Sequence, residues 1–326
     1  MSAEPTERPW RRRLQRYGPW VVAAVAIAAI LVKYPPERIA AEMTQGDLAG
    51  TVPYAALLVF GGIFLLSASD WLVINGAMQP PDEARVSYLH ATRARAGMSL
   101  LGLLGYGASV GGVGVWIARV TASGAALAGG VALYLMATDL IAVSTVAAAA
   151  FWIGRPDVAP ALGIVAPIIA AVLLLLALVG PFGLLVPREK LPRVFQPWSR
   201  IDSGRAALAV ILRTVNICWI TTMVWLGANA FGMTVPLGAM ATFFPIILVV
   251  GSMPVNVAGF GAVQGAWLLL EPWANSGEQV IAFSVLWHLV VACAIAFRGL
   301  PFVKAVVSEV AHGKSAEARV DSTKDP

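Results

Sequence analysis

Charged residues are scarce in this chain. Asp, Glu, Lys and Arg make up 13% of its 326 residues, whereas soluble domains average about 25%. Hydrophobic residues make up 58%, and the mean hydropathy is +0.76. A surface with so little charge cannot face water over most of its area. The composition therefore excludes a chain built of ordinary soluble domains and predicts a protein embedded in lipid.

The residues of metal and nucleotide chemistry are few as well. The chain has two cysteines and three histidines. Cys218 and Cys293 lie inside apolar runs, which is typical of small apolar packing residues and not of a disulfide framework. No P-loop or HExxH motif is present. We therefore expect no cofactor, no metal and no catalytic residue of those classes. The basic residues lie where a membrane topology needs them, so we also expect no nucleic-acid partner.

Long apolar runs are abundant. A helix needs roughly 20 apolar residues to cross about 30 Å of hydrocarbon. Runs of about this length lie at residues 18–33, 53–78, 125–153, 159–180, 206–232 and 278–299. Two more apolar stretches, 97–118 and 236–272, are interrupted by glycine and proline. Backbone groups cannot stay unpaired in lipid. We therefore predict an all-α polytopic membrane protein with about six full transmembrane helices and two Gly/Pro-broken re-entrant elements.

The basic residues predict the topology. Lys and Arg collect in cytoplasmic loops, and clusters of them lie before residue 18, at 79–96, at 188–205 and beyond residue 297. All four clusters fall on the cytoplasmic side only if 97–118 and 236–272 enter the bilayer and return. The first run, 18–33, has no small-x-small cleavage site after it, so we interpret it as an uncleaved helix. We predict a multi-pass protein of the bacterial inner membrane with both termini cytoplasmic.

Under this predicted topology, the two halves of the chain have the same order of elements. Residues 18–158 and 159–302 each contain two helices, a Gly-rich re-entrant element and a further helix, but start from opposite sides. That order is typical of an inverted-topology repeat, which in many carriers places the site between the repeats. The alternative is that both Gly-rich segments are ordinary spans with small-residue packing faces. A basic cytoplasmic tail, 1–17, precedes the repeats, and a polar tail, 303–326, expected to be disordered, follows them.

The most distinctive stretch is residues 252–267. Pro254 lacks a helix donor, and Gly259 and Gly261 allow backbone conformations closed to other residues. We expect one helix to break here and another to begin near residue 262. The N-terminus of the new helix would suit an anionic head group. The alternative is a tight packing turn.

The same stretch resembles the signature of the lysylphosphatidylglycerol synthase transmembrane-region family, also called flippase-like proteins. Members of that family read Pro-small-x-x-Gly-Gly-x-Gly-x-Arg-Glu at this point. Pro254, Gly259 and Gly261 match this signature, whereas Val263 and Gln264 replace the Arg-Glu pair. Gln264 keeps the shape and hydrogen-bonding capacity of Glu without its charge.

Two further positions are similar to the family pattern. Asp139 precedes a small apolar run, as an acidic residue does in the fourth element of the family, and Arg213 corresponds to an arginine near the sixth. The resemblance covers most of residues 50–300. It implies a flippase-like protein that carries an anionic or aminoacylated phospholipid, or a lipid-linked molecule, between leaflets. The alternatives are a membrane-embedded enzyme or subunit acting on a lipid-linked substrate, and a non-transporting scaffold. The expected partners are membrane phospholipids, with a partner membrane protein or transferase as a further expectation.

Polar residues inside the apolar runs are the candidate ligand-binding residues, because charges in lipid face a cavity or a partner. With the Gly-rich stretch they make up the following set: Asp139, Arg213, Asn216, Asn256, Gly259, Gly261, Gln264 and His288. Asp139, Arg213 and His288 are expected to line a groove for a lipid head group. The alternative is a structural Asp139–Arg213 ion pair and a helix–helix hydrogen bond from His288. For an enzyme, the one reactive pair that the sequence offers is Asp139 with His288.

A further prediction concerns the segment before the first Gly-rich element. Residues 84–95 carry basic residues among apolar ones, which is typical of a short amphipathic helix lying in the membrane interface. Val86 and Leu89 are expected to face lipid.

Overall fold

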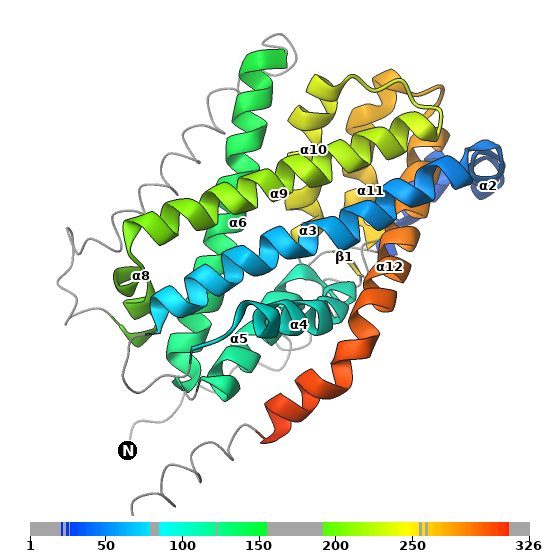
Figure 1. The fold of residues 1–326 in the computed structure, drawn as a ribbon. Coiled ribbons are helices and arrows are strands. Elements are labelled where there is room, and N and C mark those ends of the chain that lie inside the picture. The colour runs from blue at the N-terminus through cyan, green and yellow to red at the C-terminus, as the bar shows by residue number, and fades with distance from the viewer. Residues whose placement is uncertain are drawn as a thin grey trace, which may run out of the picture.

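The computed structural model describes residues 27–78, 85–121, 123–154, 192–253, 256–257 and 260–312, together with residues 21, 24 and 25 (Figure 1). The predicted span at 159–180 and both predicted tails, except for residues 303–312, lie outside the described residues. Residues 27–33 are helical and belong to the first predicted span.

Four helices in the described part of the chain are long and apolar enough to cross a membrane. These helices are α3 (Leu48–Ala77), α6 (Gly124–Gly154), α9 (Ser203–Ala230) and α12 (Gly277–His312). They coincide with four of the predicted runs, and they make the chain a membrane-embedded, predominantly helical protein. α12 continues past residue 302, where the sequence predicts a polar tail. A short helix, α2 (Pro36–Gln45), connects the first run to α3.

The ends of two of these helices are fixed by side-chain caps. Asp47 accepts a hydrogen bond of 2.8 Å from the backbone N–H of Gly50 at the start of α3. Asp202 accepts one of 2.9 Å from the backbone N–H of Arg205 at the start of α9. An aspartate at this position satisfies donors that have no partner in the first helical turn. The boundaries of both helices therefore follow directly from local sequence.

The apolar stretch at 97–118 forms a helical hairpin. α4 (Tyr88–Met98) continues into the 3-10 helix η1 (Ser99–Leu103), the chain reverses at Gly105, and α5 (Tyr106–Val120) returns. Gly105 has a φ of 142°, which only glycine adopts readily. The ring of His90 in α4 lies 5.2 Å from that of Trp116 in α5. The two arms, α4 with η1 and then α5, therefore run side by side, and at about 26 and 22 Å each is shorter than the hydrocarbon is thick.

The stretch at 236–272 forms a second hairpin. α10 (Leu237–Ser252) leads to a reversal in which β1 (Asn256–Val257) pairs antiparallel with β2 (Phe260–Gly261). α11 (Ala262–Trp267) and η4 (Leu268–Trp273) form the returning arm. The backbone N–H of Thr234 donates to the carbonyl of Trp273 at 2.9 Å, so the two ends of the segment meet. Neither Gly-rich stretch is therefore a continuous rod.

The hairpins pack on long helices that are distant in the sequence. α3 and α9 lie side by side through the middle of the molecule (Figure 1). α4 of the first hairpin packs against α12, and α10 of the second packs against α6. Two remaining elements, η3 (Arg193–Phe195) and α8 (Gln196–Arg200), pack against α6 just before α9 begins.

The short helix predicted at 84–95 forms with shifted bounds, as α4. The helix begins at Tyr88 and forms the first arm of the hairpin, with Ser87 as its N-cap. Val86, expected to face lipid, is 3% exposed because the side chain of Asn75 bonds both its N–H and its C=O, at 3.0 and 2.9 Å. Leu89 is 69% exposed, as expected. The amphipathic pattern reflects packing of α4 against α3 and α12.

Candidate functional site

Arg213 lies at the centre of a buried network of charged side chains. Its side chain is completely buried on α9. Its Nη2 lies 2.5 Å from Oδ1 of Asp70, its Nη1 contacts Oδ1 of Asp139, and its Nε donates to Oγ of Ser69 at 3.0 Å. A guanidinium taken out of water is stable only when it is paired and hydrogen-bonded. Two long helices, α3 and α6, supply these partners to Arg213 of α9.

The first hairpin joins the same network through both of its arms. On α4, Nη1 of Arg95 lies 3.4 Å from Oδ2 of Asp70. At the tip, where α5 begins, the hydroxyl of Tyr106 donates to Oδ2 of Asp139 at 2.5 Å. The position of this hairpin is thus coupled to the buried charges, because moving its tip breaks a charge-assisted hydrogen bond.

One carboxylate of the network is partly exposed. The side chain of Asp139 is 19% exposed, whereas that of Asp70 is 3% exposed. Two arginines and two aspartates balance, but Arg298 of α12 lies within electrostatic range of Arg95 and donates to the carbonyl of Val59. Among the residues that the structure describes, this group of five charges has one cation in excess, and the carboxylate of Asp139 is its partly exposed anion.

The structure brings together three of the predicted site residues. Asp139 and Arg213 form the ion pair that one interpretation of the sequence expected. Asn216 lies one turn further along α9 and is 2% exposed. Its Oδ1 is buried and has no hydrogen-bond partner in the described part of the chain. A Cβ added at Gly62 would approach this oxygen to 2.8 Å, so α3 packs closely against it.

The other predicted residues gather at the second hairpin. Oε1 of Gln264 accepts from the N–H of Gly261 at 2.6 Å, so this side chain caps α11. His288 lies with Nδ1 2.6 Å from the carbonyl of Ser284 in its own helix, and its ring lies 6.1 Å from that of Trp267. Asp139 pairs with Arg213 and Tyr106, so the structure does not support the reactive Asp139–His288 pair considered for an enzyme.

Two of the predicted positions are described only in part or not at all. The backbone of Asn256 pairs with that of Gly261 in the turn between α10 and α11, so one helix ends and another begins at Ala262, as expected. The side chain of Asn256 and the whole of Gly259 lie outside the described residues.

The members of the network that sequence reasoning missed include Arg95 and Tyr106. Arg95 was assigned to the cytoplasmic cluster at 79–96 because it precedes the apolar stretch. A count of the charged residues inside the apolar runs could have indicated a second buried arginine. Asp70 and Asp139 lie inside apolar runs with a single arginine, Arg213, to match them, and buried charges occur in pairs. No comparable signal marks Tyr106.

The comparisons with known proteins do not identify a family. No protein-family model matches the chain, and no curated protein matches it. The resemblance to flippase-like proteins therefore stays a prediction from sequence. Among the residues that the structure describes, no group of three or more His, Cys, Asp and Glu side chains could hold a metal ion.

Proposed function

We propose that this chain is an integral membrane flippase-like protein that translocates an anionic or aminoacylated phospholipid, or a lipid-linked anion, between leaflets. The observation that carries the proposal is the buried network around Arg213. It is linked to a hairpin tip at Tyr106 and reaches the outside at Asp139. A purely structural ion pair has no need of a partly exposed carboxylate bonded to a hairpin tip.

The excess of one cation in the network favours an anion as the cargo. When the phosphate of a head group approaches the open side, it can take the place of Asp139 opposite Arg213. The guanidinium then stays paired throughout, which avoids the penalty of several kcal/mol for a lone buried charge. Asp139 afterwards forms its ion pair with Arg213 again and displaces the head group. A neutral head group has no such exchange available.

The arrangement of the elements supports an inverted-topology repeat. If the halves are exchanged, α3 corresponds to α9, α4 to α10 and α6 to α12. The pair α3–α9 then maps onto itself, and the packing of α4 on α12 maps onto that of α10 on α6. Carriers of this type bind cargo between the repeats and move one repeat against the other. The network supports such a site, because α3 and α6 of the first half supply its aspartates and α9 of the second half supplies Arg213.

The test is leaflet exchange in proteoliposomes. Fluorescent phosphatidylglycerol in the inner leaflet becomes accessible to a membrane-impermeant quencher only when it moves outward. We expect the purified protein to speed this movement more for phosphatidylglycerol than for phosphatidylcholine. The variant Asp139→Asn should slow it several-fold, because Asn still accepts from Tyr106 but no longer competes with the head group for Arg213.

The matched control is Asp47→Asn. Asp47 is an N-cap, and Asn serves there as well as Asp does, so this variant loses the same charge without loss of stability or exchange. If folded protein moves no anionic or aminoacylated lipid, the translocation proposal is overturned, and the scaffold or subunit alternatives remain.

A further inference from the structure

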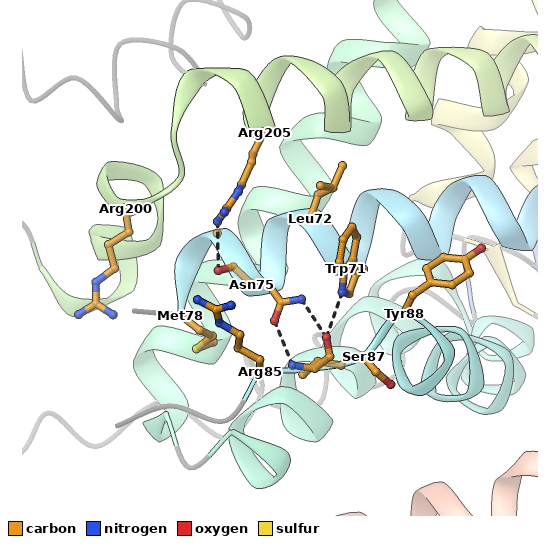
Figure 2. A pocket seen from close by; sticks show the side chains of 11 residues that line it. Trp71, Leu72, Asn75, Met78, Arg85, Ser87, Tyr88, Arg200 and Arg205 are labelled. Atoms are coloured by element: carbon orange, nitrogen blue, oxygen red, sulfur yellow. Dashed lines mark hydrogen bonds between the residues drawn. The ribbon is translucent and has the colours of Figure 1, made fainter. Parts of the chain in front are cut away.

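A second polar feature lies where α3 ends. Here a pocket of about 700 Å³ opens between the last turns of α3, the segment leading into α4, and the segment leading into α9 (Figure 2). Residues that line it include Trp71, Asn75, Arg85, Tyr88, Arg200 and Arg205. The volume is within the range of about 300–1,000 Å³ that is usual for small-ligand sites. The pocket is separate from the network at Arg213.

Two of the arginines are fixed on the end of α3. Nη1 of Arg200 donates to the carbonyl of Ala77 at 3.3 Å, and Nη1 of Arg205 donates to that of Asn75 at 3.4 Å. The last carbonyls of a helix have no partner within the helix, and they carry partial negative charge. These contacts hold the guanidinium groups at the pocket while using only part of their donor capacity.

The described residues that line the pocket include three arginines and no carboxylate. Oδ2 of Asp202, outside the lining, lies 3.2 Å from Nε of Arg205. The side chain of Arg85 has no ion pair or hydrogen bond to any residue that the structure describes. Figure 2 shows Arg85 and Arg205 reaching toward the end of α3 from opposite sides.

The apolar wall of the pocket is held in place. Nε1 of Trp71 donates to the carbonyl of Val86 at 3.0 Å, and the amide of Asn75 donates to the same carbonyl at 2.9 Å. Asn75 also accepts from the N–H of Val86 at 3.0 Å. A wall fixed by three hydrogen bonds is preorganised for a ligand. Trp71 is partly exposed at the end of an apolar span, as tryptophans at a membrane interface are.

We propose that this pocket binds the phosphate group of an anionic ligand, with Arg85 and Arg205 as its ligands and Trp71 as an apolar wall. The planar fork of a guanidinium matches phosphate oxygens, and arginines from two chain segments can bind the same group. The phosphate can belong to a lipid head group at the interface or to a soluble phosphate compound. This site goes beyond the proposed translocation and does not depend on it.

Equilibrium binding to the purified full chain in uncharged detergent tests the site. The probes are radiolabelled inorganic phosphate and short-chain dihexanoyl phosphatidylglycerol. We expect the double variant Arg85→Gln/Arg205→Gln to weaken binding by about tenfold or more. The control is Arg93→Gln/Arg119→Gln, which removes two exposed arginines outside the pocket and should bind as the unmodified protein does.

Each outcome of this binding experiment either supports or overturns the proposed phosphate site. Saturable binding of phosphatidylglycerol that inorganic phosphate displaces only weakly supports the site and assigns it to lipid. Binding of inorganic phosphate with no gain from the lipid supports the site and assigns it to a soluble phosphate compound. Absence of binding by either probe, or equal loss in the two double variants, overturns the proposal. The double variants are compared by binding and not by leaflet exchange, so failure of the pocket and failure of translocation are distinguishable.

Discussion

The backbone N–H of Thr234 donates a hydrogen bond of 2.9 Å to the carbonyl of Trp273, 39 residues further along the chain. Between them the chain runs out along α10, reverses, and returns along α11 and η4. The rings of His90 and Trp116, 5.2 Å apart, close the first hairpin in the same way. Each hairpin therefore ends beside the place where it begins, which is what a segment that enters a membrane and turns back requires.

The reversal at Gly105 provides a first prediction. Its φ of 142° is strained for any other residue, while a Cβ there would meet nothing within 4 Å. We expect Gly105→Ala to lower the free energy of unfolding by about 1–3 kcal/mol through backbone strain alone. Gly111→Ala is the control, because Gly111 lies inside α5 with equal open space and alanine favours a helix. Thermal unfolding in detergent should separate the two; equal stability would argue against this turn.

The buried network provides a second prediction. Arg213→Gln leaves Asp70 and Asp139 without their shared cation, so we expect a loss of about 3–5 kcal/mol in the free energy of unfolding. Arg38 offers the comparison, since its side chain is 75% exposed and lies 3.6 Å from Glu278. Arg38→Gln should cost no more than about 1 kcal/mol. Chemical denaturation in micelles measures both, and a loss for Arg213→Gln as small as that for Arg38→Gln would contradict the network.

A carboxylate on α12 holds the open end of the first hairpin. Oε2 of Glu309 lies 2.9 Å from Nε2 of His90 and accepts from Nε1 of Trp116 at 2.8 Å. Glu309→Ala removes both contacts, so we expect faster amide hydrogen exchange in α4 and α5. Lys304→Ala, an exposed change on the same helix, should leave exchange as it is. If amide hydrogen exchange in α4 and α5 is the same in both variants, Glu309 does not stabilise the hairpin.

Much of the fold could be predicted from sequence because apolar length and glycine placement are local signals. The runs at 53–78 and 206–232 became α3 and α9 with small shifts at their ends, which the caps at Asp47 and Asp202 explain. The turning back of 97–118 and 236–272 followed from the charges of the flanking loops. What failed was the expectation that Val86 faces lipid, since an apolar residue at 84–95 could face either lipid or protein.

The candidate site was harder to predict, because it depends on which helices meet. Asp139 and Arg213 were recognisable as buried charges, and the structure joins them. Their link to Tyr106 depends on where the hairpin tip falls against α6, for which the sequence has no local signal. His288 bonds the carbonyl of Ser284 within its own helix and lies beside Trp267, and its place in a head-group groove stays a prediction.

Cysteine labelling in sealed vesicles tests the central claim, that each hairpin enters the membrane and returns. In a Cys218→Ala/Cys293→Ala background, the substitutions Arg85→Cys and Arg119→Cys bracket the first hairpin, and Thr234→Cys and Asn275→Cys bracket the second. A membrane-impermeant maleimide should reach both members of a pair from the same face, and the two pairs from opposite faces. If either pair is labelled from opposite faces, that segment crosses the membrane and the account is wrong.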